Sequence, residues 1–565
     1  MLRDLWPAWW PIICWRNVTY SAVKSLGNKA MSESGRQVGW ARQLGVVGWS
    51  VALAVFWLCV LRNVELPGLY MDAVNPDYLF ARWLNPELKN PVWAIPSGGV
   101  PLLGNLYHGV QTLYVGVLTY GVLGTSVVSV RVTHALYGSL IVLLTWLILR
   151  RVSGRSLLAT VLATALATDM AFIGSFRTQA YIILAGQVWM MLALWLAVRS
   201  VQEQAPSRWL LALSGLGMGL AVYGYFVFLF FLPPVAALAV LGPGRQGVGR
   251  RLLAWGAGFV VGMLPYVIGY IELAVALGGM GPLIAWMRNV LGVLGPTVVH
   301  ETYGEGLGHV LGYALWGLAG LGNEHMVIGE AVSLPLAGWR TGCVALAGIV
   351  CLLGTWWEWS ERPRLAKVLL AGVALPVAYI GLAAGFGSRL DVHHFTVLVA
   401  VGYVLLGLAA CWLALRLPQG RWLGGMAAVL AASLFLLNVV QQNRVHARLT
   451  ATGGVGMSTD ALPALARTAL TERAHAVWFF PEWGFFMPFA FLTANQVPYE
   501  NELTVASLER HAVSGKEMRV AFWKEENQRM YREVLEQAGI RNIELRQMHR
   551  RDGQVALYVL AGSSP

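Results

Sequence analysis

The chain has 565 residues, of which 57% are hydrophobic and only 12% are charged. Soluble domains carry about 25% charged residues, so this composition excludes a water-soluble particle and indicates a surface that faces mostly lipid. The net charge of +12 comes from short basic clusters between apolar runs, a pattern typical of membrane helices rather than of a nucleic-acid-binding surface.

The N-terminal segment, residues 1–43, is rich in Trp and basic residues, and the first apolar run begins near Leu44. That position is too far into the chain for a simple cleaved signal peptide, so we predict an uncleaved cytoplasmic leader that lies on the membrane. The chain has five cysteines and no CxxC pattern. We therefore predict neither a disulfide nor a cysteine metal site.

The apolar runs predict an α-helical polytopic membrane protein, because a span needs about 20 apolar residues to cross the hydrocarbon. We expect about eleven transmembrane helices in a module at 44–440, with a tight turn near Gly224 between the fifth and the sixth. The predicted spans are 44–61, 132–149, 156–174, 181–198, 209–225, 226–241, 252–271, 341–356, 367–385, 395–415 and 422–440.

Basic residues gather in the joints after alternate spans, and this bias predicts the orientation. These joints are 150–155, 199–208, 245–251, 362–367 and 416–421. Together with the basic leader, they place the N-terminus in the cytoplasm, and an odd number of spans then places the C-terminus outside. We expect a bacterial inner membrane with a periplasmic C-terminus.

Two long outer loops follow from this topology, at 62–131 and 272–340. The first contains six prolines and is predicted to be mostly irregular, with a short helix near Asp77–Leu84 capped by Asn75-Pro76. The second is rich in glycine, and its apolar patches are too short to span, so we predict interfacial or re-entrant structure.

Residues 441–565 carry more charge and lack long apolar runs, which predicts a small extracytoplasmic α/β domain. We expect a strand at Val477–Phe480 and a helix at Phe522–Gln537. Two further strands, Ile543–Met548 and Val555–Leu560, flank Arg551-Asp-Gly and predict a hairpin.

Ionisable residues at the membrane point to function, because burying them is costly. Asp169 is the one acid within a predicted span, and the other candidates fall in outer joints: Asp72, Asp77, Arg177, Arg389, Asp391, His393 and His394. All lie on one side at similar depth. A transporter more often places charges near the midplane between repeated halves, so the pattern favours an enzyme at the outer interface.

The segment Leu66-Pro-Gly-Leu-Tyr-Met-Asp72, with Asp77-Tyr78 behind it, resembles the opening of GT-C glycosyltransferases. These integral membrane enzymes use polyprenyl-phosphate sugars. The segment Ser175-Phe-Arg-Thr-Gln-Ala-Tyr181 and the Arg/His-containing joint before the tenth span are similar to that family as well.

The resemblance implies that an acid in the first outer loop is the catalytic base. Many relatives have two adjacent acids there, whereas Asp72 is followed by Ala73. We favour Asp72, with Asp77 either an alternative base or a helix cap. Asp169 has either a substrate or acceptor role or a structural ion pair with Arg177.

Arginine forms charge-assisted hydrogen bonds to phosphate, so the phosphate-binding candidates are Arg177 and Arg389, with His393 and His394 beside them. Arg177 could instead reach lipid headgroups, and the histidines could simply face water. The residues expected to line the substrate cavity are Tyr78, Tyr181, His300 and Glu301.

The stretch His300–His309 contains two His and two Glu, which raises the question of a metal site. Glu301, Glu305 and His309 would share one face of a helix, but Gly304, Gly306 and Gly308 argue against a stable helix. The spacing matches no trusted zinc pattern, so we predict no metal site and a polar loop that lines the cavity. Some relatives hold a divalent ion, which leaves a divalent cation open.

The aromatic run from Trp478 to Tyr499 is either a sugar-stacking surface or a face that docks the C-terminal domain on the membrane part. Docking is favoured, because the run is too apolar to stand free in water.

The sequence therefore predicts an inverting glycosyltransferase that moves a hexosyl or pentosyl group from a polyprenyl-phosphate donor to an acceptor hydroxyl. The acceptor is left open between a lipid, a glycan and a protein, and the partners include membrane lipids but no nucleic acid. The alternatives are a glycan polymerase or ligase with a diphosphate-linked donor, a lipid or small-solute transporter, and a non-catalytic scaffold.

Overall fold

The computed structural model describes residues 46–91, 100–178, 181–203, 206–242, 247–294, 301–318, 324–329, 337–416 and 421–564. The predicted leader, 1–43, lies outside these ranges. The α-helices are Val46–Leu61, α2 (Leu79–Leu84), α3 (Gln111–Leu123), α4 (Val127–Ser153), α5 (Ser156–Ala167), α6 (Met170–Ser175), α7 (Tyr181–Gln202), α8 (Arg208–Gly224), α9 (Leu232–Val240), α10 (Val248–Ala276), α11 (Met280–Leu294), α12 (Tyr303–Leu318), α13 (Glu324–Ile328), α14 (Ala337–Glu361), α15 (Pro363–Ala383), α16 (Val397–Arg416), α17 (Arg421–Thr452), α18 (Ala461–Thr471), α19 (Phe486–Leu492), α20 (Val505–Ala512) and α21 (Gln528–Gln537).

Short 3-10 helices and strands complete the described structure. The 3-10 helices are η1 (Met71–Val74), η2 (Phe226–Phe231), η3 (Gly387–Arg389), η4 (Val392–Thr396), η5 (Gly456–Ser458) and η6 (Glu525–Asn527). The strands are β1 (Leu103–Asn105), β2 (His108–Gly109), β3 (Ala476–Phe479), β4 (Tyr499–Glu500), β5 (Glu517–Phe522), β6 (Arg541–His549) and β7 (Val555–Ser563).

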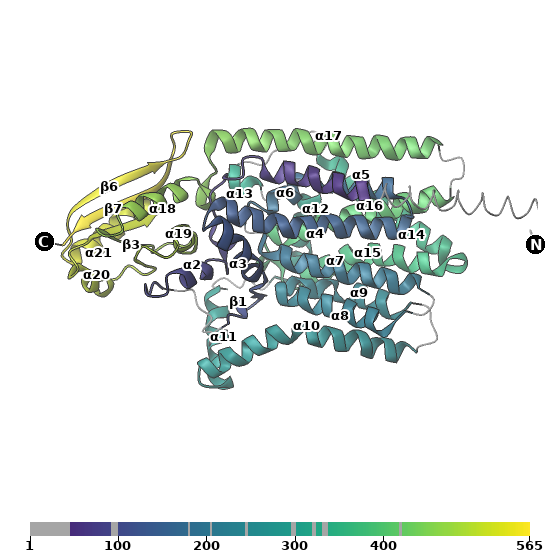
Figure 1. Ribbon diagram of the computed structural model, residues 1–565, viewed down its shortest axis with the longest axis horizontal. Coiled ribbons are helices and arrows are strands. Elements are labelled where there is room, and N and C mark those ends of the chain that lie inside the picture. Colours follow the sequence, from purple (N-terminus) through teal and green to yellow (C-terminus); the bar gives the residue numbers. More distant parts are fainter. Residues whose placement is uncertain are drawn as a thin grey trace, which may run out of the picture.

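Most of the molecule is a bundle of apolar helices with a sheet at one end (Figure 1). Among the described residues, six helices are long and apolar enough to cross a membrane: Val127–Ser153, Ile183–Gln202, Val248–Ala276, Gly338–Glu361, Pro363–Ala383 and Val392–Arg416. Shorter apolar helices are Val46–Leu61, Gln111–Leu123, Ser156–Ala167 and Phe226–Val240. The chain is thus a multi-pass membrane protein, and the count of about eleven spans stays a prediction.

One predicted turn is confirmed, and two predicted spans differ in detail from the structure. The expected turn near Gly224 is confirmed, because α8 ends there and Tyr225 is extended before η2 and α9. The predicted span 156–174 is wrong as one helix, since it breaks at Thr168–Asp169 into α5 and α6. The predicted span 422–440 is the first part of α17, which continues to Thr452 and reaches the sheet (Figure 1).

The basic joints lie together at the end of the bundle away from the sheet. Arg151 at the end of α4 donates to the Gln202 side chain at the end of α7 over 2.6 Å. Arg364, in the first turn of α15, donates to the Gln202 carbonyl oxygen over 3.2 Å, and Lys367 donates to that of Leu241 over 2.5 Å. Joints far apart in the sequence therefore share one face of the molecule.

The C-terminal sheet has the strand order β4-β3-β5-β7-β6. β3 is parallel to β4 and β5, whereas β7 is antiparallel to β5 and β6. The hairpin predicted around Arg551-Asp-Gly is β6–β7 and is confirmed. The helix predicted from Phe522 is wrong at its start, because Phe522 closes β5 and α21 begins at Gln528.

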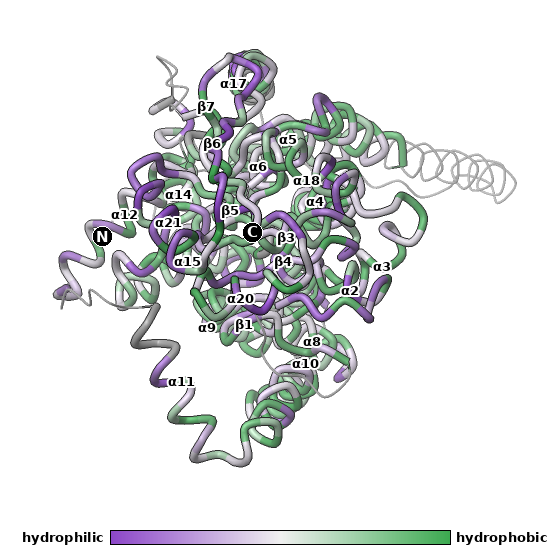
Figure 2. The backbone as a smooth tube through the Cα atoms, turned by 90° about the vertical axis from the view of Figure 1, so that its left-hand side faces the viewer, coloured by the Kyte–Doolittle hydropathy of each residue, from purple (hydrophilic) through white to green (hydrophobic). Residues whose placement is uncertain are grey.

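Alternate residues of β3 pack on opposite faces of the sheet. Val477 and Phe479 belong to a core beneath α20 and α21, while Trp478 and Phe480 pack with α18, α19 and the first outer loop. Figure 2 views this end of the molecule and shows hydrophilic residues in β6, α20 and α21 in front of hydrophobic helices such as α10.

The aromatic run docks the sheet on the first outer loop, as the sequence favoured. Phe486, Phe489 and Phe491 are buried in one cluster with Tyr78 and Tyr120. Docking excludes water from a surface too apolar to be exposed.

The outer loop 62–131 is more ordered than its prolines suggested. It includes η1, α2, the β1–β2 pair and α3. The cap expected from Asn75-Pro76 is wrong: α2 begins at Leu79, and its N-cap residue Tyr78 makes no side-chain capping bond.

Candidate functional site

Two buried arginines hold the start of the first outer loop. Arg131 on α4 donates to the carbonyl oxygens of Pro67 and Gly68 at 3.4 and 3.3 Å, and to that of Phe176 at 2.8 Å. These bonds tie the loop that precedes Asp72 to the bundle. Buried carbonyl groups need such partners, so the loop geometry depends on this guanidinium.

Arg177 holds the same loop through its carbonyl groups. Its guanidinium donates to the carbonyl oxygens of Val60, Arg62, Asn63 and Leu66, with donor–acceptor distances of 3.0 Å for Val60, 2.9 Å for Asn63 and 2.5 Å for Leu66. The side chain is buried. The two terminal nitrogens of the guanidinium are thus bonded to backbone carbonyls, and the role of Arg177 as a phosphate ligand stays a prediction.

Asp72 lies on η1 and is partly exposed, while its neighbours Met71, Ala73 and Val74 are buried. Burial of the carboxyl group raises the pKa of Asp72 to about 6, and the nearby His393 ring partly offsets that rise. An accessible carboxylate with a pKa near neutrality is suited to take up a proton.

The ring of His393 on η4 lies near Asp72 and beside a second carboxylate. Its Nδ1 atom lies 3.5 Å from the Asp391 Oδ2 atom. The hydroxyls of Tyr107 and Tyr225 are within electrostatic reach of Asp72 as well. Segments from three distant parts of the sequence, the first outer loop, the start of η2 and η4, therefore converge on one carboxylate.

His394 supports this site from behind rather than facing it. Its Nε2 atom lies 3.1 Å from the Tyr225 hydroxyl, and its Nδ1 atom lies 3.1 Å from the Asp391 backbone nitrogen. The Tyr225 ring also stacks on His108, with centroids 5.9 Å apart. Both ring nitrogens of His394 have partners within the protein, and its role as a phosphate ligand stays a prediction.

Asp77 and Tyr78 lie in the docking interface, and their site roles stay predictions. Asp77 is buried and accepts a hydrogen bond from the Tyr120 hydroxyl over 2.9 Å. Tyr78 is buried edge-on against Phe486, with ring centroids 6.2 Å apart.

Asp169 has structural partners in the bundle, and its catalytic role stays a prediction. Its carboxylate caps α6 by accepting from the Ala171 nitrogen over 2.9 Å. It also accepts from the Tyr403 hydroxyl over 2.9 Å and forms an ion pair with Arg340. The expected pair with Arg177 is thus replaced by one with Arg340.

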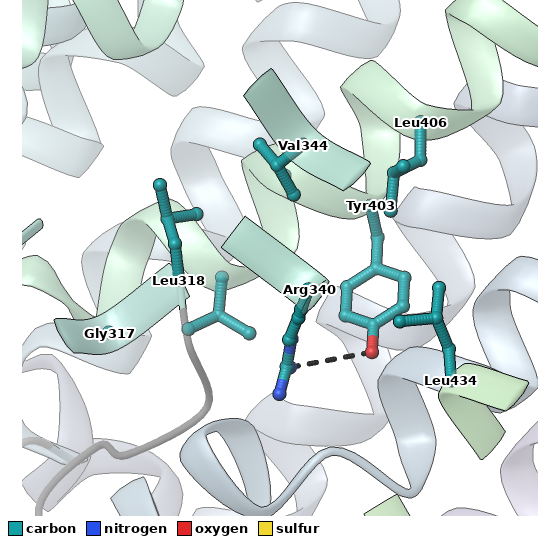
Figure 3. Close-up of a pocket in the computed structure, with 9 residues that line it drawn as sticks. Gly317, Leu318, Arg340, Val344, Tyr403, Leu406 and Leu434 are labelled. Atoms are coloured by element: carbon teal, nitrogen blue, oxygen red, sulfur yellow. Dashed lines mark hydrogen bonds between the residues drawn. The ribbon is translucent and has the colours of Figure 1, made fainter. Parts of the chain in front are cut away.

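Arg340 lines a small pocket between α12, α14, α16 and α17. Figure 3 shows its guanidinium bonded to Tyr403 beside Val344 and Leu434. The other lining residues drawn there are apolar. The pocket is a packing feature around the buried Asp169–Arg340 pair.

The stretch with three alternate glycines is helical, contrary to the prediction. The Glu305 carboxylate accepts from the backbone nitrogen of Thr302 over 2.8 Å and from its hydroxyl over 2.9 Å, which caps α12. A Cβ atom at Gly306 would lie 2.3 Å from the Ala384 carbonyl oxygen, so the glycine permits close packing.

The Glu301 carboxylate is bonded within the protein rather than free in a cavity. It accepts from the Ser388 nitrogen over 3.0 Å, and its Oε1 atom lies 3.6 Å from His309 Nε2. Within the described ranges, no group of three or more His, Cys, Asp or Glu could hold a metal ion.

For the three remaining site candidates, the structure describes the whole residue in one case, the backbone alone in the second, and nothing in the third. Arg389 is exposed at the end of η3, two residues before Asp391. Tyr181 is the first residue of α7, and its side chain lies outside the described structure. His300 also lies outside the described residues.

Comparison with solved structures identifies the fold. No family model and no curated protein sequence matches the chain. The structure of ArnT from Cupriavidus metallidurans bound to undecaprenyl phosphate is similar over 93% of this chain and 98% of that one, with a TM-score of 0.52 and 14% identity. The chain has the GT-C fold.

Two further GT-C structures are similar at lower TM-scores. The archaeal oligosaccharyltransferase AglB from Archaeoglobus fulgidus, in complex with an inhibitory peptide and a dolichol-phosphate, matches 88% of this chain and 68% of that chain, with 14% identity and a TM-score of 0.47. The arabinofuranosyltransferase AftD from Mycobacteria matches 93% of this chain and 40% of that chain, with 14% identity and a TM-score of 0.40.

Sequence reasoning missed the aromatic residues around Asp72. Tyr107 lies in a part of the first loop that was predicted to be irregular, and Tyr225 was predicted as the end of a span. Tyr70 lies two residues before Asp72 in the motif quoted above. Its closeness to Asp72 in the sequence could have identified Tyr70 as a site residue. The pKa of Tyr70 is raised to about 12 by burial and by the nearby Asp72 charge.

Proposed function

We propose that this protein is an inverting glycosyltransferase that moves a sugar from a polyprenyl-phosphate donor to an acceptor hydroxyl at the outer face of the membrane. The observation that carries the proposal is Asp72, a partly exposed residue on the first outer loop of a GT-C fold, whose carboxyl pKa is raised to about 6 by burial. The sequence placed the base at the same residue.

The chemistry is a single displacement. Asp72 takes the proton of the acceptor hydroxyl, the acceptor oxygen attacks the anomeric carbon, and the bond from that carbon to the phosphate oxygen breaks. The electron pair stays with the leaving polyprenyl phosphate, which gains one negative charge. One displacement inverts the anomeric centre.

Arg389 and His393 are the residues that we assign to the leaving phosphate. Arg389 is exposed, so its guanidinium is available for charge-assisted hydrogen bonds. His393 lies near Asp72, with its Nδ1 atom 3.5 Å from the Asp391 Oδ2 atom, so its ring is placed to donate a hydrogen bond to an oxyanion there. Arg177 and His394 have no part in this proposal.

The membrane setting supplies the rest of the proposal. The protein lies in a bacterial inner membrane, with the basic joints in the cytoplasm, about eleven spans, and the C-terminal sheet as a domain in the periplasm. Support comes from the gathering of the basic joints at the end opposite the sheet.

The test is an assay on the purified protein with a panel of polyprenyl-phosphate sugars. Donor turnover by the wild type is expected to fall at least a hundredfold in Asp72→Asn, which keeps the side-chain shape but removes the base. Arg389→Gln is expected to raise the KM for the donor about tenfold or more.

Asp552→Asn, in the hairpin turn far along the chain, is the control and should turn over donor like the wild type. Turnover that survives in Asp72→Asn would disprove the assignment of the base. No turnover of any donor by the wild type would count against the proposed function and favour a transporter.

A further inference from the structure

One side chain of the aromatic run, that of Trp483, stays partly exposed where the run packs on the first outer loop. Phe485, Phe486 and Phe489 are buried, but Trp483 in the same run is 41% exposed. The run therefore has two parts, one that packs against the first outer loop and one indole ring that remains open beside that loop.

The Trp483 ring is held next to the loop that carries Asp72. Its indole N–H donates to the Tyr70 hydroxyl. The backbone nitrogen of Gly484 donates to the Met71 sulfur over 3.3 Å. Tyr70 and Met71 are the two residues directly before Asp72, so both contacts fix Trp483 relative to the base.

The backbone around Trp483 is braced from the sheet side. The Trp483 carbonyl oxygen accepts from the Trp523 indole over 2.8 Å, and Trp523 stacks on Phe485 with centroids 3.9 Å apart. The Glu482 carboxylate accepts from the Trp523 nitrogen over 2.6 Å and from the Tyr531 hydroxyl over 3.1 Å. An exposed ring on such a rigid loop loses little freedom when a ligand packs on it.

We propose that Trp483 is an acceptor-binding residue and that the acceptor presents a sugar ring to it. An indole face is apolar and electron-rich, so it attracts the C–H face of a sugar ring, while the anchored N–H end keeps the ring oriented. The inference rests on the proposed function and adds the class of acceptor to it.

The test compares transfer with hydrolysis in one reaction. Purified protein is given the polyprenyl-phosphate sugar that it turns over, together with methyl glycosides of glucose, mannose, galactose and arabinofuranose as acceptor probes. Mass spectrometry measures the ratio of glycoside product to free sugar. Trp483→Ala is expected to lower this ratio about tenfold, and Trp483→Phe is expected to keep most of it.

Trp209→Ala is the matched control, because Trp209 is 79% exposed at the start of α8, the end opposite Tyr225. An unchanged ratio in Trp483→Ala would overturn the inference. So would a parallel loss of transfer and hydrolysis, which would assign Trp483 to positioning the Asp72 loop. If Trp483→Ala kept a normal ratio but lost more thermal stability, relative to the wild type, in nanodiscs than in detergent, Trp483 would be assigned to the bilayer interface.

Saturation-transfer NMR with the same methyl glycosides separates this inference from the proposed function. If the wild type turned over no donor, the proposed function would fail, but a glycoside signal lost in Trp483→Ala would still support a sugar site. If the wild type hydrolysed donor but neither bound nor glycosylated any methyl glycoside, the inference would fail and the donor chemistry would stand.

Discussion

At the residue scale, the two arginines of the sequence prediction show how burial decides what a cation does. Arg177 is buried and donates to four backbone carbonyls, so its charge organises the first outer loop. Arg389 is exposed and keeps its donors for a ligand. An arginine in one outer joint thus stabilises the loop, whereas in our proposal an arginine in another outer joint binds the substrate.

The raised pKa of Asp72 makes a testable prediction for pH dependence. A base must be deprotonated to act, and the pKa of Asp72 is about 6 because the carboxyl is buried. The value of kcat/KM is therefore expected to level off above pH 6 and to fall about tenfold for each unit below it. The measurement is donor turnover across the range from acidic to mildly alkaline pH.

The residual activity of Asp72→Asn should lack this acidic limb. A wild-type profile that stays flat through pH 6, or a variant that keeps the same limb, would show that another group is titrating. The comparison needs both proteins because buffers and detergent can impose pH effects of their own.

At the element scale, α8 and α10 pack through glycines spaced four residues apart. A Cβ atom at Gly215 would lie 1.9 Å from the Trp255 carbonyl oxygen, and one at Gly258 would lie 1.9 Å from that of Ala212. Small residues at this spacing let two membrane helices approach closely. The contact fixes α8, whose last residue precedes Tyr225 at the site.

Gly258→Ala is expected to destabilise the protein by about 1–3 kcal/mol, because the new methyl group overlaps a backbone atom that cannot move alone. Gly256→Ala in the same helix is the matched control, since a Cβ there meets nothing within 4 Å. It should be neutral or slightly stabilising, by up to about 1 kcal/mol. Thermal unfolding in detergent measures both. Equal melting temperatures for the two variants would contradict this packing.

At the scale of the whole molecule, the sheet is fixed to the membrane part by polar contacts as well as by aromatic packing. The Asn90 amide donates to the Asn495 side chain over 2.9 Å and to the Val497 carbonyl oxygen over 2.8 Å. It also accepts from the Tyr499 nitrogen over 3.0 Å. Each of these groups is buried, so each needs its partner.

Asn90→Ala is expected to loosen this docking, because it leaves buried groups of the 495–499 segment unpaired, at about 1–3 kcal/mol for each group. Hydrogen exchange measured by mass spectrometry should become at least tenfold faster at residues 494–500. Asn501→Ala, at a partly exposed position just past β4, is the control. Unchanged exchange in Asn90→Ala would mean that aromatic packing alone holds the sheet.

Local sequence patterns were sufficient to predict much of the fold. Long apolar runs predicted the membrane helices, because crossing hydrocarbon requires a continuous apolar segment whatever its neighbours are. The turn after Gly224 and the hairpin around Arg551-Asp-Gly depend on adjacent residues, and both are confirmed. The helix α12 was missed although its signal is local as well, since Thr302 and Glu305 form a capping pair that outweighs three glycines.

The site was only partly predictable. The sequence by itself determined a membrane protein with a carboxylate at position 72 on an outer loop. Only the tertiary structure decided that Arg177 binds backbone carbonyls, that Asp169 pairs with Arg340, and that Tyr107 and Tyr225 come near Asp72. The physical reason is that the role of a buried polar side chain depends on its hydrogen-bond or ion-pair partner. These partners are separated by tens to hundreds of residues in the sequence.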